Sequence, residues 1–310
     1  MHRKAYALLL LTTLLWGGNA VAGKLAVGHV SPMTLVFFRW VMAVIILLPI
    51  GGRAFVEDWP IIRRHLFLLL ILGACGFSLF NVIFYAALNY TTAINVSIEQ
   101  ASMPILIIVA NFLFFRLRIG WLQALGVMLT IVGVILTASH GDPAQILKLN
   151  LNFGDAIMLI AVVLYRGYSV GLRLKPVMQW QSLMLALSIA ALLVSVPFLV
   201  WEIASGSAIF PDWEGWAITL YTALGASVIS QVTYIRGIEL IGANRAGLFI
   251  NLVPIFGTLL SILILGEDFH LYHAIALALV FGGIWLAEHG SRRTVAKQRA
   301  GPFCRKQRRG

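Results

Sequence analysis

Residues 179–201 read QWQSLMLALSIAALLVSVPFLVW and contain no charged side chain. A helix needs about 20 mainly apolar residues to cross roughly 30 Å of hydrocarbon, so this stretch predicts a transmembrane helix. Working outward from it, similar runs occur along the whole chain, and ten helices are expected. The other nine lie near residues 5–27, 33–51, 65–88, 94–115, 119–138, 153–172, 215–236, 243–265 and 270–289.

The composition also indicates a membrane protein. Hydrophobic residues make up 60% of the 310-residue chain and charged residues 11%, whereas soluble domains carry roughly 45–50% and about 25%. The connections between the runs are too short to hold a domain outside the bilayer. We therefore expect an all-α integral membrane protein, in which any chemistry takes place inside the helix bundle.

The distribution of basic residues predicts the orientation. With the amino terminus in the cytoplasm, 19 of the 23 Lys and Arg residues lie on the inner side, as the positive-inside rule requires. Both termini are then cytoplasmic, and the expected location is the bacterial inner membrane. Residues 290–310 form a basic tail that we expect to be disordered and to meet anionic lipid rather than nucleic acid. The alternative reading of the first run, a cleaved secretory leader, is disfavoured by its length.

An internal repeat relates the two halves of the chain. The first copy is expected at residues 1–140 and the second at residues 153–289. Similar residues coincide at a shift of 149 or 150, namely Trp16 with Tyr165, Asn19 with Tyr168, Ser78 with Ser227, Tyr85 with Tyr234, Pro104 with Pro254 and Gly133 with Gly283. Because each copy has five helices, an odd number, the second copy enters the membrane inverted. Inverted repeats are typical of secondary transporters, which bind substrate near the bilayer midplane.

Polar residues within apolar spans mark the faces that turn towards the bundle interior. Their helical spacing repeats in the two halves, which favours a shared cavity over simple interhelical packing, although such residues also mediate packing in lipid. The predicted substrate-binding residues are Trp16, Asn19, Ser78, Asn81, Tyr85, Gln100, Tyr165, Tyr168, Ser227, Gln231, Tyr234 and Asn251.

A second set of intramembrane residues is expected to have structural or gating roles. Pro104 and Pro254 should kink the fourth and ninth helices. Arg39 and Glu99 lie at similar depth, which favours a structural ion pair between them and leaves open a coupling or substrate role for Glu99. Arg166 either extends towards the interface or pairs with Glu239.

Enzyme-like patterns carry little weight in this sequence. Gly167–Gly171 fits G-x-S-x-G, but that motif acts on a strand-to-helix turn and here it falls within a predicted membrane helix. His270 and His273 have no third ligand nearby, and no phosphate-binding glycine loop occurs. We therefore expect no enzyme, no metal and no cofactor.

The chain resembles the drug/metabolite transporter superfamily, specifically the ten-helix exporters built from two EamA-type domains. The residues that carry the resemblance are Leu14–Asn19, Pro32, Phe38-Arg39, Tyr85–Leu88, Ala93–Pro104, Asn251–Pro254 and Gly266-Glu267. Among these exporters it is most similar to those of aromatic amino acids. The resemblance implies export of aromatic and other neutral amino acids through a central cavity by alternating access, and the alternative is efflux of drugs or cationic compounds. Helix one lacks the carboxylate that the related multidrug proteins use for proton exchange, so proton coupling stays open, as does the choice between monomer and dimer.

Overall fold

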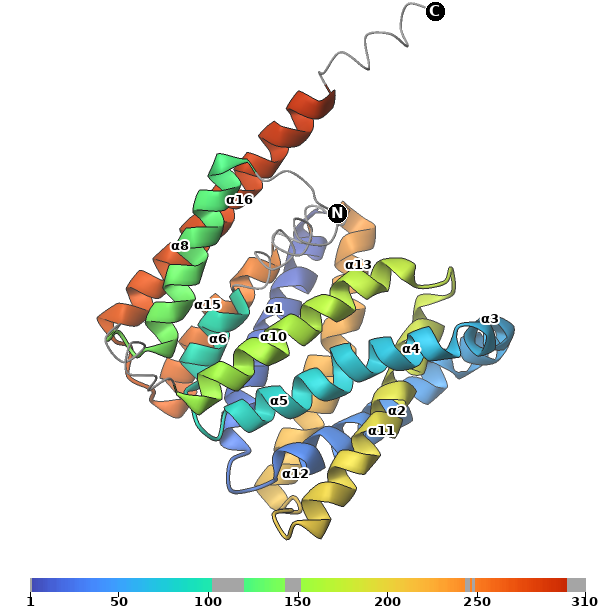
Figure 1. The fold of residues 1–310 in the computed structure, drawn as a ribbon. Coiled ribbons are helices and arrows are strands. Elements are labelled where there is room, and N and C mark those ends of the chain that lie inside the picture. The colour runs from blue at the N-terminus through green and yellow to red at the C-terminus, as the bar shows by residue number, and fades with distance from the viewer. Residues whose placement is uncertain (1, 102–119, 143–151, 243–245, 247–248, 300–310) are drawn as a thin grey trace, which may run out of the picture. The chain divides into compact units, whose positions relative to one another are not determined.

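The structure is a computed structural model that describes residues 2–101, 120–142, 152–242, 246 and 249–299 (Figure 1). The described residues form helices and turns, with no β-strand among them. Five helices are long and apolar enough to cross a membrane: Arg3–Leu25, Pro32–Glu57, Leu66–Ala87, Trp180–Ala204 and Trp213–Ile241. Shorter apolar helices occur at Trp121–Thr137, Phe153–Tyr165, Ile250–Leu265 and Leu271–Ala287. The all-helical class is confirmed, whereas the count of ten stays a prediction because most of the run near 94–115 lies outside the described residues.

The chain forms two compact units. One comprises Met1–Gln100 and Asn152–Asp268, and the other comprises Ala101–Leu151 and Phe269–Gly310. The second unit contains α8 (Trp121–Ala138) and α16 (Leu271–Arg299). The other elements are α1 (His2–Leu25), α2 (Pro32–Glu57), α3 (Trp59–Arg64), α4 (Leu66–Gly73), η1 (Ala74–Leu79), α5 (Phe80–Ala87), α6 (Ala93–Ala101), α10 (Phe153–Gly171), η2 (Leu172–Leu174), α11 (Trp180–Ala204), α12 (Trp213–Leu220), η3 (Tyr221–Ile229), α13 (Ser230–Ile241), η4 (Ile250–Leu252), α15 (Val253–Leu260) and η5 (Ser261–Leu265).

Two of the long helices contain π-helical segments at corresponding positions. The segment η1 joins α4 to α5, and η3 joins α12 to α13. A shift of 149 residues carries η1 onto residues 223–228, which lie within η3, and places Gly76 on Gly225. π-Helical turns inside α-helices are frequent at functional sites. The sequence predicted continuous helices here, because one extra residue per turn hardly changes an apolar pattern.

The helices α2 and α11 form an antiparallel pair (Figure 1). At one end Glu202 of α11 accepts hydrogen bonds from the backbone N–H groups of Met33 and Thr34, at 3.2 and 2.8 Å. At the other end Asp58, next to α2, accepts one from Gln179 N, just before α11, at 3.0 Å. Each helix start therefore receives a carboxylate from the end of its partner, which satisfies N–H groups that the helix leaves free.

Further pairs of packed helices correspond in the two halves. The helix α1 packs against α13, and its counterpart α10 packs against α5. In α2 and α11, internal prolines occur at Pro49 and Pro197, 148 positions apart. Sequence reasoning missed this proline pair, although the repeat shift could have revealed it.

In the second unit α8 and α16 pack side by side (Figure 1) through glycines. A Cβ at Gly126 would overlap the Gly283 backbone, and a Cβ at Gly133 would lie 2.9 Å from the Ala276 carbonyl oxygen. The order of these two contacts makes the helices antiparallel. A shift of 150 residues exchanges one contact with the other, so the pair has the internal symmetry of the repeat.

Candidate functional site

Four predicted site residues meet at one buried arginine. Arg39 of α2 is 5% exposed, and its Nε donates a hydrogen bond to Ser227 Oγ at 2.8 Å. Its Nη1 donates to Asn19 Oδ1 at 3.2 Å, to Asn81 Oδ1 at 3.0 Å and to the Tyr85 hydroxyl. We call these five residues the Arg39 cluster. Its members come from α1, α2, α5 and η3 and thus from both halves of the sequence.

Local bonds hold the acceptors of the Arg39 cluster in place. The Tyr85 hydroxyl donates to Asn19 Oδ1 at 2.9 Å, and Ser227 Oγ donates to the Thr222 carbonyl at 2.9 Å. Asn81 Nδ2 donates to the Phe77 carbonyl of η1. Carbonyl groups of both π segments therefore orient side chains that face Arg39, which gives the π-helical geometry a role at this site.

Arg39 has no ion-pair partner among the described residues. Their ion pairs join His29 to Asp212 and Glu214, Arg53 to Glu57, and Arg236 to Glu239. The expected ion pair of Arg39 with Glu99 is not among them. Glu99 is fully buried in α6 and interacts electrostatically with Asp155 of α10. Two residues at the same depth in the membrane meet only if both helices are rotated so that the side chains face each other. In the structure, the rotation of α2 about its axis directs Arg39 towards neutral acceptors.

Several hydrogen-bond donors beside the Arg39 cluster have no acceptor among the described residues. None of the described bonds uses Arg39 Nη2, and Trp40 Nε1 and Ser78 Oγ are buried without a partner. An unsatisfied buried donor costs about 1–3 kcal/mol. The region therefore contains hydrogen-bond donors that no described acceptor uses.

Aromatic rings extend from the Arg39 cluster across unit 1. The ring of Trp40 stacks on Phe77 at 4.9 Å, and Phe77 contacts Tyr168 at 5.7 Å. Tyr168 lies 5.5 Å from Tyr165, which in turn lies near Tyr234. Further ring pairs join Trp16 to Tyr234 at 5.3 Å and Phe80 to Tyr165 at 4.9 Å. We call these seven residues the aromatic row, and four of them, Trp16, Tyr165, Tyr168 and Tyr234, are predicted site residues.

The remaining predicted residues are less informative. Gln100, Gln231 and Asn251 are half-buried. Pro104 lies outside the described residues, as does the side chain of Arg166. Pro254 was expected inside a kinked helix, but it lies in the first turn of α15, directly after the 3₁₀ turn η4. A proline fits this position because the first turn has no acceptor for its missing N–H.

A second polar group, which sequence reasoning missed, surrounds Asp155. This carboxylate is fully buried in α10 and accepts hydrogen bonds from Thr91 Oγ1 and Asn95 Nδ2. Nearby, Glu267 accepts from the backbone N–H groups of Ala93 and Ile94, at 2.8 and 2.9 Å, and so caps α6. Asp155 lies two residues after the start of a predicted span, where acidic residues are common at helix starts, so nothing in the sequence pattern singled it out.

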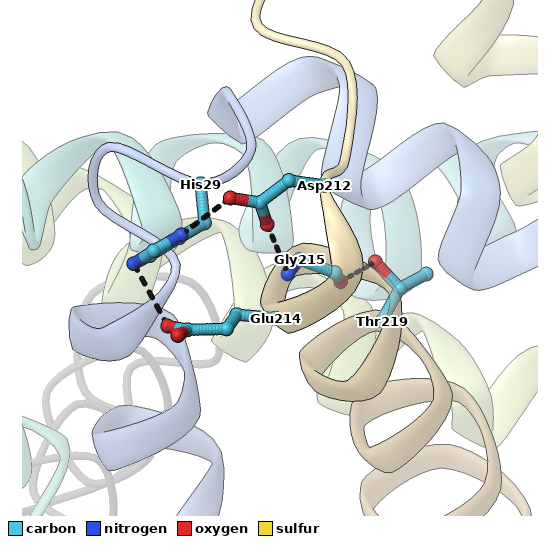
Figure 2. Close-up of polar contacts among 5 residues, drawn as sticks. All are labelled: His29, Asp212, Glu214, Gly215 and Thr219. Atoms are coloured by element: carbon cyan, nitrogen blue, oxygen red, sulfur yellow. Dashed lines mark hydrogen bonds and ion pairs between the residues drawn. The ribbon is translucent and has the colours of Figure 1, made fainter.

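At one end of α2 and α11, two loops are joined through a histidine, as Figure 2 shows. His29 Nδ1, in the α1–α2 loop, lies 2.8 Å from Asp212 Oδ2, and its Nε2 lies 3.1 Å from Glu214 Oε2. The backbone N–H of Asp212 donates to the His29 carbonyl at 3.4 Å, and Asp212 Oδ1 caps α12 by accepting from Gly215 N at 2.8 Å. We call His29, Asp212 and Glu214 the first clasp.

A second clasp joins loops at the other end of the same helix pair. Asp58 accepts a hydrogen bond from Gln179 N, and Glu57 accepts one from Gln179 Nε2 at 3.1 Å. The repeat shift relates the α1–α2 loop to the loop that contains Gln179, and the α2–α3 loop to the one that contains Asp212. The second clasp (Glu57, Asp58 and Gln179) is therefore the counterpart of the first clasp and lies at the opposite end of the α2–α11 pair.

The first clasp is expected to depend on pH. The hydrogen bond to Asp212 raises the pKa of His29 above 6.5, and the same bond lowers the pKa of Asp212 below 3.8. The contribution of His29 to stability is complete below pH 6.5 and is lost as pH rises through its raised pKa; that of Asp212 is complete above pH 3.8 and is lost as pH falls through its lowered pKa.

In a thermal unfolding assay in detergent, the wild-type protein should therefore lose more stability between about pH 5.5 and about pH 8.5 than the His29→Gln variant. An equal loss in the two proteins would mean that the ion pairs of His29 do not stabilise the fold.

The sequence profile of the EamA-like transporter family matches residues 3–139 and 152–288. The chain belongs to the EamA-like transporter family. This membership agrees with the described apolar helices and identifies a multi-pass membrane transporter of the drug/metabolite transporter superfamily.

Similar proteins are also named as transporters. The uncharacterized transporter YetK of Bacillus subtilis is 26% identical over 284 residues, which cover 91% of this chain and 86% of YetK. The uncharacterized inner membrane transporter YicL of Salmonella typhimurium is 24% identical over 304 residues, which cover 94% of this chain and 97% of YicL. A solved crystal structure aligns over 95% of this chain and 99% of its own, with a TM-score of 0.61 and 18% identity, and so shares the fold.

Proposed function

We propose that this EamA-family transporter exports aromatic and other neutral amino acids across the bacterial inner membrane by alternating access. Ten helices in two inverted five-helix repeats, with both termini in the cytoplasm, enclose the substrate site. Transport needs no ATP and follows the gradient of the substrate or of a coupled ion.

The observation that carries the proposal is the position of the Arg39 cluster. It is a buried polar site drawn from both halves of the chain, and the aromatic row lies directly beside it. The aromatic rings suit an apolar or aromatic side chain through stacking and burial. The two clasps join loops at opposite ends of α2 and α11, where alternating access needs its two gates.

The inverted arrangement has independent support. The repeat partners α8 and α16 run antiparallel, and so do α2 and α11. Two copies inserted in the same sense would place corresponding helices parallel. With the amino terminus inside, the first clasp lies on the outer face of the membrane and the second on the inner face.

The alternative, efflux of cationic drugs, finds less support at this site. The charged member of the Arg39 cluster is itself a cation, and among the described residues it has no ion-pair partner to neutralise it. A positively charged substrate would be repelled there. If Glu99 bound a cationic substrate, it would do so from α6, which contributes no residue to the Arg39 cluster.

A counterflow assay tests the proposal. Purified protein in liposomes loaded with unlabelled phenylalanine should accumulate labelled phenylalanine without ATP, and other neutral amino acids inside should also drive uptake. Absence of flux across a broad panel of amino acids, together with uptake of a cationic dye, would overturn the proposal in favour of drug efflux.

A further inference from the structure

We propose that Arg39 recognises the carboxylate of the transported amino acid, with Trp40 and Ser78 as additional hydrogen-bond donors. The inference rests on the proposed function and deepens it by naming the group that the site selects. Its basis is the imbalance at the Arg39 cluster, where a buried cation and unused donors lie beside neutral acceptors that are already engaged.

The charge argument begins with the cost of burial. A guanidinium in an apolar bundle is expensive unless an anion lies nearby. The partners of Arg39 are two amide oxygens and two hydroxyls, all of them neutral. Of the twelve acidic residues in the chain, those that the structure describes form no ion pair with Arg39. An anionic ligand would supply the missing charge.

The donor argument concerns geometry. Arg39 uses Nε and Nη1 for protein contacts, and no described bond involves Nη2. Trp40 Nε1 and Ser78 Oγ are buried without acceptors among the described residues. The Trp40 ring lies 5.3 Å from the Arg39 guanidinium carbon, and Ser78 lies three residues before Asn81, which accepts a hydrogen bond from Arg39. A ligand that fits this region must bring acceptors, and a carboxylate brings two oxygens that suit a guanidinium.

The corresponding position in the second half of the chain carries no cation. At a shift of 149 residues Arg39 falls on Ser188 of α11, and the serine that Arg39 binds, Ser227, falls on Ser78. Both Ser188 Oγ and Ser78 Oγ are buried without a partner among the described residues. The second copy packs its corresponding helix without a charge, so the charge of Arg39 serves something that only one copy provides.

The aromatic row provides a place for the side chain of an amino acid whose carboxylate is bound at Arg39. The guanidinium carbon lies 5.3 Å from the ring centre of Trp40 and 5.8 Å from that of Tyr85, and the row continues from Trp40 through Phe77 to Tyr168. A substrate with its carboxylate at Arg39 would lay its side chain along these rings. Carboxylate recognition would thus be common to all substrates, and the row would set the preference among side chains.

The test compares L-phenylalanine with L-phenylalaninamide, which lacks the carboxylate, in proteoliposomes. Wild-type protein should prefer phenylalanine by roughly 100-fold in kcat/KM, the worth of a charge-assisted pair. Arg39→Gln should remove most of this preference by lowering kcat/KM for phenylalanine while changing that for the amide little. Arg39→Lys should restore part of it. Arg236→Gln, which removes an exposed arginine paired with Glu239, serves as the matched control and should retain the preference.

A loss of both fluxes in equal measure in Arg39→Gln, with unchanged thermal unfolding, would overturn the inference and assign Arg39 a purely structural role. If this variant does not fold, Trp40→Phe and Ser78→Ala replace it, because each removes one donor and keeps the surrounding packing; each should raise KM for phenylalanine several-fold and by a larger factor than KM for the amide. Equal transport of phenylalanine and amide by wild-type protein would refute the inference but leave amino-acid export standing, whereas no transport of either would refute export itself.

Discussion

A disulfide between positions 29 and 212 is expected to stop transport. In the first clasp, the backbone N–H of Asp212 donates to the His29 carbonyl at 3.4 Å, which brings the two main chains about as close as those of bridged cysteines, roughly 4.4–6.8 Å between Cα atoms. If the loops must separate for substrate to leave, a covalent bond between them holds the protein in one state. Flux through the oxidised His29→Cys/Asp212→Cys protein should fall at least ~10-fold, and a reductant should restore it.

The disulfide experiment requires a background without the native cysteines. Cys75 is half-buried in η1 and Cys304 lies in the basic tail, so both are first replaced by serine. The single variants His29→Cys and Asp212→Cys should transport equally well under oxidising and reducing conditions. Undiminished flux with the disulfide formed, as judged by mass spectrometry, would show that the first clasp does not open during transport.

Loss of the Glu202 carboxylate is expected to destabilise the fold by about 2–4 kcal/mol, the cost of leaving several hydrogen bonds to a charged group unmade. Glu202 is 4% exposed and binds Ser31 Oγ, Thr34 Oγ1 and two backbone N–H groups of α2, at 2.7–3.2 Å. The side chain of Ser31, the residue before α2, accepts no capping hydrogen bond from a backbone N–H of the first turn. Glu202→Ala should therefore unfold at a clearly lower temperature in detergent.

Glu239→Ala is the control for Glu202→Ala, because its exposed carboxylate pairs only with Arg236 of the same helix among the described ion pairs. Its effect should stay within roughly 0.5 kcal/mol. Glu202→Gln keeps one acceptor oxygen and should fall between wild-type protein and Glu202→Ala. If Glu202→Ala unfolded at the wild-type temperature, the start of α2 would not depend on α11.

Sequence reasoning found the members of the Arg39 cluster but not its connections. Asn19, Asn81, Tyr85 and Ser227 were identified because polar side chains in apolar spans almost always face a bundle interior. Their common partner was missed, since a linear pattern gives the depth of Arg39 but not the rotation of α2 against its neighbours. For the same reason Glu99 was expected to pair with Arg39, whereas none of the described ion pairs joins the two residues.

The elements that sequence reasoning missed are those that depend on contacts distant in the chain. The clasps join residues such as His29 and Asp212, which are 183 positions apart, and neither residue stands out locally. The π segments differ from α-helix by too little to disturb hydropathy, so only the repeated Gly76 and Gly225 hinted at them. The family and the helical class, in contrast, follow from long apolar runs, a signal that tertiary contacts do not override.

The contact between α8 and α16 has the form of an isologous interface, in which the same patch is used twice around a two-fold axis. Gly126 meets Gly283 just as Gly133 meets Ala276. If the two halves arose by fusion of two copies of a gene, one five-helix protein would have made this contact with a second copy of itself. A single polypeptide that carries both sides of such a contact allows each half to diverge, as the arginine at position 39 and the serine at position 188 differ.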